Sequence, residues 1–151
     1  MITVGVISDT HGLLRPEAIE MLSGSELIIH AGDIGAPWIV DRLMTIAPVR
    51  AIRGNTDRDP WAQRMPDSIV VEVEELRILV VHDAGPIGGG CRGDRYAAVV
   101  SGHSHLPSLD ERDGVLFFNP GSAGPRRFNL PVSVGKLYVQ DGRVRGKILK
   151  L

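Results

Sequence analysis

The sequence predicts an α/β fold in which two β-sheets pack against each other. Short runs rich in Val and Ile recur along the 151 residues, with turn residues between them. In the first third these runs alternate with helical patterns, which is typical of parallel strands joined by crossover helices. In the second half strands follow one another without helices, which indicates a second sheet. A prior of about 100–200 residues per domain makes 1–151 one domain.

The first third is predicted to run strand, helix, strand, helix, strand. The expected strands are 2–8, 27–30 and 49–53, all apolar and rich in β-branched residues. The expected helices are 17–22 and 38–46, because Pro16 and Pro37 precede them and proline favours the first turn of a helix.

The second half is predicted to consist of strands joined by short turns. The expected strands are 68–74, 77–82, one that ends at 99–101, 115–119, 132–140 and 144–149. Glu74-Glu75 is read as a tight connection, and Asp141-Gly142 is a strong hairpin turn. The glycine-rich stretch 85–93 is expected to be a loop, either simply flexible or facing a substrate.

Composition and charge exclude several classes of protein. The 17 basic and 18 acidic residues give a net charge of −1, which argues against bulk nucleic acid or an anionic membrane as the main partner. No apolar run approaches the ~20 residues of a membrane helix. One cysteine, Cys91, forms no internal disulfide, so nothing requires an oxidising compartment. We expect a cytoplasmic protein.

Five of the apolar runs lead directly into residues that bind metals in proteins. These residues are Asp9, His11, Asp33, Asn55, His82, His103 and His105. In open α/β sheets, ligands bind beyond the carboxyl ends of the strands. If the five strands are neighbours, the seven side chains converge along one edge. Each motif is common by chance, but the joint pattern indicates a metal site.

The residue types indicate which metals would bind. Imidazole and carboxylate without thiolate suit Mn, Fe, Zn, Co or Ni, of which we favour Mn. Seven ligands exceed the needs of one tetrahedral zinc and suit two divalent ions. Two ions carry +4 and the two carboxylates return −2, so the site would attract an anionic substrate and stabilise a phosphoryl group in transfer.

The ordered motifs Asp9-Thr-His11, Gly32-Asp33, Gly54-Asn55, His82 and Gly102-His103-Ser-His105 resemble the motif set of the calcineurin-like metallophosphoesterases. The short length and Asn119-Pro120-Gly121-Ser122 resemble their small single-domain phosphodiesterase branch. This resemblance implies a four-layer α-β-β-α sandwich of two mixed β-sheets. It also implies that a hydroxide between two metals attacks phosphorus in line with the leaving oxygen.

The resemblance further implies a division of the ligands. One metal would take Asp9, His11 and His105, the other would take Asn55, His82 and His103, and Asp33 would bridge them. Asp33, Asn55 and His103 are the residues to which we assign catalysis.

Three departures from the family pattern bear on activity. Thr56 stands where many members carry a histidine that protonates the leaving group, so we expect weak catalysis on poor leaving groups. Asp83 stands where a glycine is usual, and it is read either as a partner of the site or as a surface residue. The helix usual at 83–98 is expected to be short or absent.

Other residues near these motifs have competing interpretations. Arg53, Arg126 and Arg127 are candidates to bind a phosphate oxygen, as is Arg58. For Arg53 and Arg58 the alternative is a solvated side chain. His30 and Trp38 are expected to be buried in the core, Asn119 to order the turn beside the metals, and Asp57 to support a ligand or cap a helix.

The sequence therefore predicts a dinuclear metal-dependent phosphoesterase that prefers phosphodiesters and acts on a small phosphate ester. A diester carries one negative charge and needs less neutralisation than a monoester dianion. The alternative is a metal-binding scaffold for protein partners with little activity. Near-neutral charge counts against a nuclease. A membrane partner is not expected, and self-association is compatible with the sequence.

Overall fold

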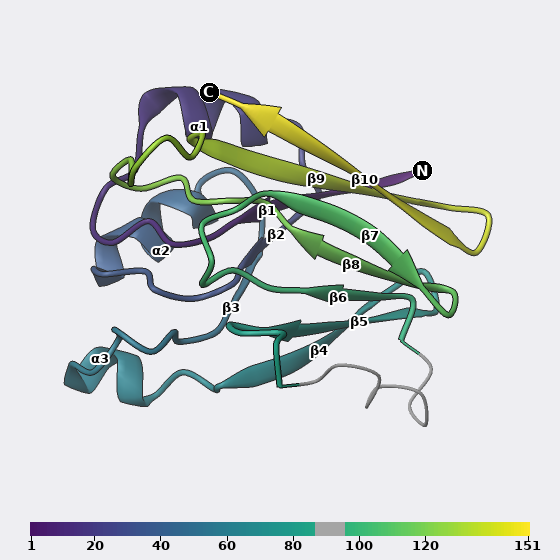
Figure 1. The fold of residues 1–151 in the computed structure, drawn as a ribbon, viewed down its shortest axis with the longest axis horizontal. Helices are drawn as coiled ribbons and strands as arrows, with labels where there is room; N and C mark the ends of the chain where they lie inside the picture. The colour runs from purple at the N-terminus through teal and green to yellow at the C-terminus, as the bar shows by residue number, and fades with distance from the viewer. Residues whose placement is uncertain (87–95) are drawn as a thin grey trace.

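The computed structural model describes residues 1–86 and 96–151 (Figure 1). Most of the predicted loop 85–93, including Cys91, lies outside the described residues. The helices are α1 (Pro16–Leu22), α2 (Pro37–Met44) and α3 (Pro60–Gln63). The strands are β1 (Ile2–Ile7), β2 (Leu27–His30), β3 (Val49–Ala51), β4 (Ser68–Val73), β5 (Leu76–Val81), β6 (Ala98–Val100), β7 (Ser108–Arg112), β8 (Val115–Asn119), β9 (Ser133–Gln140) and β10 (Arg143–Lys150).

The strands form two mixed sheets of five strands each, as predicted. The first has the order β10-β9-β1-β2-β3, in which β1, β2 and β3 are parallel and β9 and β10 form an antiparallel hairpin beside β1. The second has the order β4-β5-β6-β8-β7, in which β5, β6 and β8 are parallel and the edge strands β4 and β7 are antiparallel. The parallel strands of each sheet all end at one edge, so the loops after them meet there.

Three two-residue turns connect the antiparallel hairpins. Each has positive φ at both positions, as a type I′ turn requires: 50° and 76° at Glu74 and Glu75, and 53° and 72° at Asp141 and Gly142. The third, Asp113-Gly114, joins β7 to β8. The sequence analysis predicted the first two of these turns but not β7, whose five residues are all exposed.

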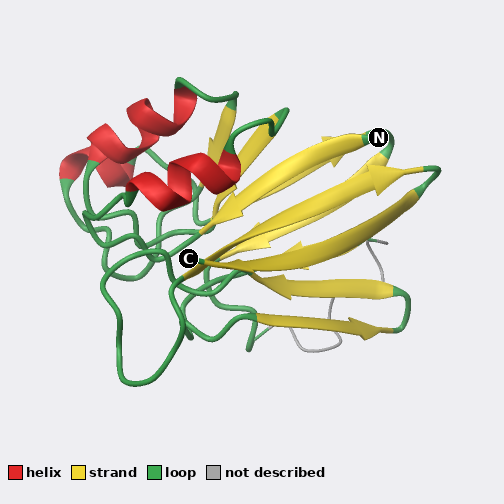
Figure 2. Cartoon of the chain, turned by 90° about the horizontal axis from the view of Figure 1, so that it is seen from above, coloured by secondary structure: helices red, strands yellow, loops and turns green. Residues whose placement is uncertain are grey.

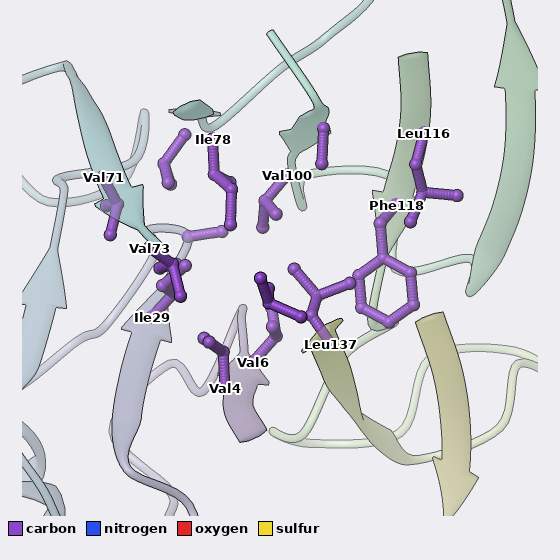
Figure 3. Close-up of a cluster of buried hydrophobic side chains, with 14 of the residues drawn as sticks. Val4, Val6, Ile29, Val71, Val73, Ile78, Val100, Leu116, Phe118 and Leu137 are labelled. Atoms are coloured by element: carbon purple, nitrogen blue, oxygen red, sulfur yellow. The ribbon is translucent and has the colours of Figure 1, made fainter. Parts of the chain in front are cut away.

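The main core lies between the two sheets. Figure 3 shows side chains of both sheets meeting there, with Val4, Val6 and Ile29 on one side and Ile78 and Val100 on the other. A second cluster covers the opposite face of the first sheet, where Ala18 and Leu22 of α1 and Ile39 and Leu43 of α2 are fully buried. Figure 2 shows these helices outside the strands. The predicted arrangement of two face-to-face sheets with helices outside is confirmed.

The expected burial of Trp38 in the core is wrong. Trp38 is 49% exposed, whereas Ile39 and Leu43 are the residues of α2 that face the sheet.

The outer face of the second sheet carries a small cluster around Val99 and Phe117. None of the helices in the described residues is long and apolar enough to cross a membrane.

Candidate metal centre

The seven predicted ligands lie together on the loops that follow β1, β2, β3, β5 and β6. In Figure 2 the loops gather at one end of the sheets, away from the N-terminus. The parallel strands place their carboxyl ends at this edge, so the polar residues that follow them emerge side by side. The predicted convergence is therefore what the fold produces.

One group of candidate ligands consists of Asp9, His11 and His105. The Nε2 atoms of the two histidines lie 3.4 Å apart, and their rings stack with centroids 5.3 Å apart. Asp9 Oδ1 lies 3.8 Å from His11 Nε2 and 3.4 Å from His105 Nε2. Three atoms that can bind a metal ion, Asp9 Oδ1 and the two Nε2 atoms, thus lie close to one another.

A second group consists of Asp9, Asp33 and His82. His82 Nε2 lies 3.2 Å from Asp33 Oδ2 and 3.8 Å from Asp9 Oδ1. Asp33 Oδ2 is also 3.7 Å from His11 Nε2. Each of the two carboxylates therefore lies 3.8 Å or less from a histidine of each group.

Asn55 and His103 extend the second group toward solvent. Asn55 Oδ1 lies 3.2 Å from His103 Nδ1. The ring of His103 meets that of His82 edge-on, with centroids 5.2 Å apart. The His103 side chain is 46% exposed, whereas Asp9 is fully buried. A substrate would therefore reach the centre from the side of Asn55 and His103.

The backbone at this edge is strained. Five of the seven ligands have left-handed φ, between 46° and 70°: Asp9, His11, Asp33, His103 and His105. Residues other than glycine seldom adopt this conformation, and clusters of such residues are typical of functional sites. At Gly54 a Cβ would collide with the carboxylate of Asp33, and at Gly102 with that of Asp9. These two glycines let the chain approach the carboxylates closely.

Buried polar atoms without partners fit a bound cation. His82 Nδ1 lies 2.7 Å from the carbonyl oxygen of Ala31. Because a carbonyl only accepts hydrogen bonds, Nδ1 carries the hydrogen, and Nε2 faces the carboxylates. Asp9 Oδ2 accepts hydrogen bonds from Ser8 Oγ and the amide of His103. Asp9 Oδ1 and His82 Nε2 are buried and make no hydrogen bond. Carbonyl-oriented histidines and hydrogen-bonded carboxylates are typical of metal ligands.

Electrostatics in the centre favour the charged form of Asp33. Burial alone would raise the pKa of Asp33, but His82 and the amide of Thr56 outweigh it and hold that pKa well below its usual range. Burial alone would lower the pKa of His82, but Asp33, the carbonyl of Ala31 and Asp9 together raise it. Burial lowers the pKa of His105, and the positive charge of Arg127 acts in the same direction.

His30 lies beneath the centre and contacts none of the ligands through the hydrogen bonds described. It is fully buried, and burial lowers its pKa to about 3. Its Nδ1 accepts a bond from the amide of Gly32, and its Nε2 lies 3.0 Å from Thr10 Oγ1. The prediction of a buried, hydrogen-bonded histidine is confirmed.

Two further residues hold the loops of the centre. Asp57 accepts bonds from the amides of Ile34, Gly35 and Gly54, so it joins the loop after β2 to the loop after β3. It is thus neither a helix cap nor a partner of a ligating histidine. Asn119 donates to the carbonyl of Gly102 and orders the turn beside the centre, as predicted.

A hollow of about 390 Å³ opens beside the second group of ligands. Its lining includes Asn55, His82 and His103, with Arg53 and Asp83 on its walls. Asp83 Oδ2 lies 4.0 Å from His103 Nε2, and the Asp83 side chain is 52% exposed. The hollow is large enough for a phosphate ester next to the ligands.

The candidate arginines occupy different places. Arg53 lines the hollow, where Asp67 and the carbonyls of Gln63 and Met65 take its Nε and Nη1 donors. Arg58 Nε bonds the carbonyl of Asn55.

The other two candidates lie on the loop after β8. Arg127 is close enough to His105 to influence its pKa. Arg126 lines a separate hollow with Arg15 and Glu17.

The sequence analysis missed Ser8 and Ser122, which support Asp9. Ser8 Oγ bonds the Asp9 carboxylate, and Ser122 Oγ bonds the Asp9 carbonyl. Ser8 stands next to a predicted ligand, so its position was a usable signal. Nothing in the sequence relates Ser122 to Asp9, because 113 residues separate them.

Residues 2–142 match the family described as the calcineurin-like phosphoesterase superfamily domain. A probable metallophosphoesterase of Methanothermobacter thermautotrophicus is 34% identical, over 97% of this chain and 91% of that protein.

Two solved structures resemble the fold. An archaeal phosphodiesterase superposes with a TM-score of 0.82 at 25% identity, covering 98% of this chain and 100% of the other. Vacuolar protein sorting 29 from Cryptosporidium parvum gives 0.78 at 21% identity, covering 99% and 97%. The second likeness concerns the fold alone.

Proposed function

Because the chain belongs to the calcineurin-like phosphoesterase family, we propose that it is a phosphodiesterase that works with two divalent metal ions. The observation that carries this proposal is the pair of buried carboxylates, Asp9 and Asp33, each of which faces histidines of both groups. The resemblance to a solved archaeal phosphodiesterase supports it.

We propose that the ligands divide as the resemblance to the family implies. Asp9, His11 and His105 would hold one ion, Asn55, His82 and His103 would hold the other, and Asp33 would bridge them. The contacts of His105 with His11 and Asp9, and of Asn55 with His103, support this division. The place of Asp33 Oδ2 near both His82 and His11 supports its role as the bridge. Ligands of oxygen and imidazole nitrogen without thiolate suit Mn, Fe, Zn, Co or Ni, and of these we propose manganese.

When bound, the two ions would supply positive charge for the phosphoryl group and lower the pKa of the attacking water. The chain's own residues would bind and orient the ester. Asn55 and His103 border the hollow and stand where a phosphate oxygen would enter. Arg127 is the arginine that we propose to contact the phosphate, because its charge already acts on His105.

Two features favour diesters over monoesters. A diester carries a single negative charge, and the centre has no additional cationic side chain in the place of Thr56. The Thr56 amide donates to Asp33 Oδ1, but its hydroxyl is no acid near neutral pH. Diesters whose leaving groups depart without protonation are therefore the better substrates.

The test compares two chromogenic esters after metal removal and replacement. Protein freed of metal with a chelator would be assayed with bis(p-nitrophenyl) phosphate and with p-nitrophenyl phosphate, each with and without Mn²⁺. We expect Mn²⁺-dependent turnover of the diester above that of the monoester. Folded protein that binds two Mn²⁺ ions and hydrolyses neither ester would overturn the proposal and favour a protein-interaction scaffold.

A further inference from the structure

A single series of hydrogen bonds joins the loop after β1 to the end of β2 and the loop that follows it, next to the candidate metal centre. It starts at the amide of Gly32, passes through the ring of His30 and the hydroxyl of Thr10, and ends at the carbonyl of Ile34. The side chains of His30 and Thr10 are completely buried. None of the proposed ligands takes part in the chain, and the proposed reaction does not use it.

The direction of every hydrogen bond in this chain is fixed. An amide can only donate, so His30 Nδ1 accepts from Gly32 over 3.2 Å and the neutral imidazole carries its hydrogen on Nε2. That hydrogen is donated to Thr10 Oγ1 over 3.0 Å. The hydroxyl then has one hydrogen left, which it donates to the carbonyl of Ile34 over 2.8 Å. No member of the chain can turn without leaving a buried polar atom unpaired.

The chain spans the two loops that carry Asp9, His11 and Asp33. Thr10 stands between Asp9 and His11, and Ile34 directly follows Asp33. Backbone bonds already align the loops, since the amides of Asp9 and His11 donate to the carbonyls of Gly32 and Asp33. However, all three ligands have left-handed φ, a conformation that the backbone does not favour by itself. A side-chain clamp between them holds this strained geometry.

We propose that Thr10 and His30 are positioning residues that set the separation of Asp9 and His11 from Asp33, and thereby the fit of the second metal ion. The inference rests on the proposed function, because it assumes that these three residues are ligands. Without the clamp, the loops keep their backbone ladder but the two carboxylates lose their fixed spacing.

The test uses Mn²⁺ binding and the electron paramagnetic resonance of the bound ions. Thr10→Val removes the hydroxyl at nearly constant volume, and Thr10→Ser keeps it. We expect Thr10→Val to weaken Mn²⁺ binding by roughly 10–100-fold, as is typical when a partner behind a metal site is lost. Its spectrum should change from that of a coupled ion pair to that of isolated ions. Thr10→Ser should restore affinity and coupling.

A control separates positioning from general stability. Ser133 is also buried, and its hydroxyl also bonds a backbone carbonyl, that of Pro120. Ser133→Ala should lower the melting temperature without changing Mn²⁺ affinity or coupling. If Thr10→Val behaves like Ser133→Ala, with two coupled Mn²⁺ ions at the affinity of the unaltered protein, the positioning role is overturned.

A second pair of variants keeps the proposal testable should Thr10→Val fail to fold. In His30→Gln the amide group can reach the place of Nε2 and donate to Thr10, whereas in His30→Asn it is too short and replaces only Nδ1. We expect the glutamine variant to bind Mn²⁺ more tightly than the asparagine variant, and equal affinities would contradict the inference. Unaltered protein that binds no Mn²⁺ would instead overturn the proposed function, and this inference with it.

Discussion

Asp9 Oδ1 and His82 Nε2 lie 3.8 Å apart in the interior of the protein, and neither atom makes a hydrogen bond. Other bonds orient both groups, since Asp9 Oδ2 accepts from Ser8 and His82 Nδ1 donates to Ala31. Leaving two buried polar atoms unpaired is costly, and native proteins rarely do so without a functional reason. Cations bound to these two atoms would remove this cost, which links metal binding to folding stability.

Metal removal should therefore lower the stability of the protein. With Mn²⁺ at 100 times its Kd, binding adds about 2.7 kcal/mol to the free energy of unfolding. For a chain of this length that corresponds to a rise in Tm of roughly 5–11 °C, measurable by calorimetry with Mn²⁺ and with a chelator. Asp33→Ala serves as the control and should show no such difference. An identical Tm in both conditions for the unaltered protein would contradict a buried metal site.

Asp33→Ala should abolish the binding of both ions rather than one. Asp33 Oδ2 faces His82 at 3.2 Å and His11 at 3.7 Å, so its loss affects both groups of ligands. Metal content per chain, measured by plasma mass spectrometry after dialysis, checks this. Asp41→Ala changes an exposed acid on α2 and should retain two ions. Two ions bound to Asp33→Ala would remove Asp33 from the bridging position.

The site was predictable from sequence because its residues directly follow apolar strands. Asp9 and Asp33 come two and three residues after the ends of β1 and β2, and parallel pairing brings those ends together. Strand pairing in the first sheet therefore converts a linear pattern into a cluster. The same reasoning does not predict the hydrogen bonds of Asp57. Its partners are backbone amides of the loops after β2 and β3, and backbone amides have no signature in the sequence.

Elements without a pattern of buried and exposed residues could not be predicted from the sequence either. All residues of β7 are exposed, so no alternation of apolar and polar residues marks it as a strand. Its one signal was Asp113-Gly114, the same kind of turn that Asp141-Gly142 forms between β9 and β10. Trp38 was expected in the core, but the buried residues of α2 are Ile39 and Leu43 instead.

The pH dependence of stability should reveal His30 in the metal-free protein. An unfolded histidine takes up a proton near pH 6.5, whereas burial lowers the pKa of His30 to about 3. Between these values the unfolded chain binds more protons, so this residue makes stability fall as the pH is lowered below 6.5, by up to about 1.4 kcal/mol per pH unit. His30→Gln lacks this dependence.

Urea unfolding in the presence of a chelator, at pH 4.5, 5.5 and 7.5, would measure the effect. The free energy of the unaltered protein should fall more steeply toward acid than that of His30→Gln. Near pH 7.5 the two curves should run parallel, which serves as the internal control. Parallel curves over the whole range would mean that His30 has the same pKa in the folded and the unfolded protein.

Thr56→His should increase the hydrolysis of diesters with poor leaving groups. The amide of residue 56 holds Asp33 Oδ1 whatever the side chain, so the ligand geometry should survive the change. An imidazole there can donate a proton to the leaving oxygen, which we expect to raise kcat for an alkyl diester roughly tenfold or more. Turnover of bis(p-nitrophenyl) phosphate should change less. Thr56→Gln is the control, and an unchanged rate with Thr56→His would show that leaving-group protonation is not limiting.

Asp57→Ala should weaken both the fold and the metal centre. The Asp57 carboxylate accepts bonds of 3.0 Å from the amide of Ile34 and 2.9 Å from that of Gly54, and these amides belong to the loops that carry Asp33 and Asn55. Removing the carboxylate leaves these donors unpaired, at a cost of roughly 3 kcal/mol in the free energy of unfolding. The loops would then separate, and Mn²⁺ affinity should fall by roughly 10–100-fold.

Asp59→Ala is the matched control, because Asp59 lies two residues away and its side chain caps no amide at the start of α3. Urea unfolding of the metal-free variants gives the stability term, and calorimetric titration with Mn²⁺ gives the affinity. If Asp57→Ala loses stability but binds Mn²⁺ as the Asp59→Ala variant does, the two loops are held in register by their backbone bonds alone. A loss of both quantities in Asp57→Ala only would show that one carboxylate couples the folding of these loops to the assembly of the metal centre.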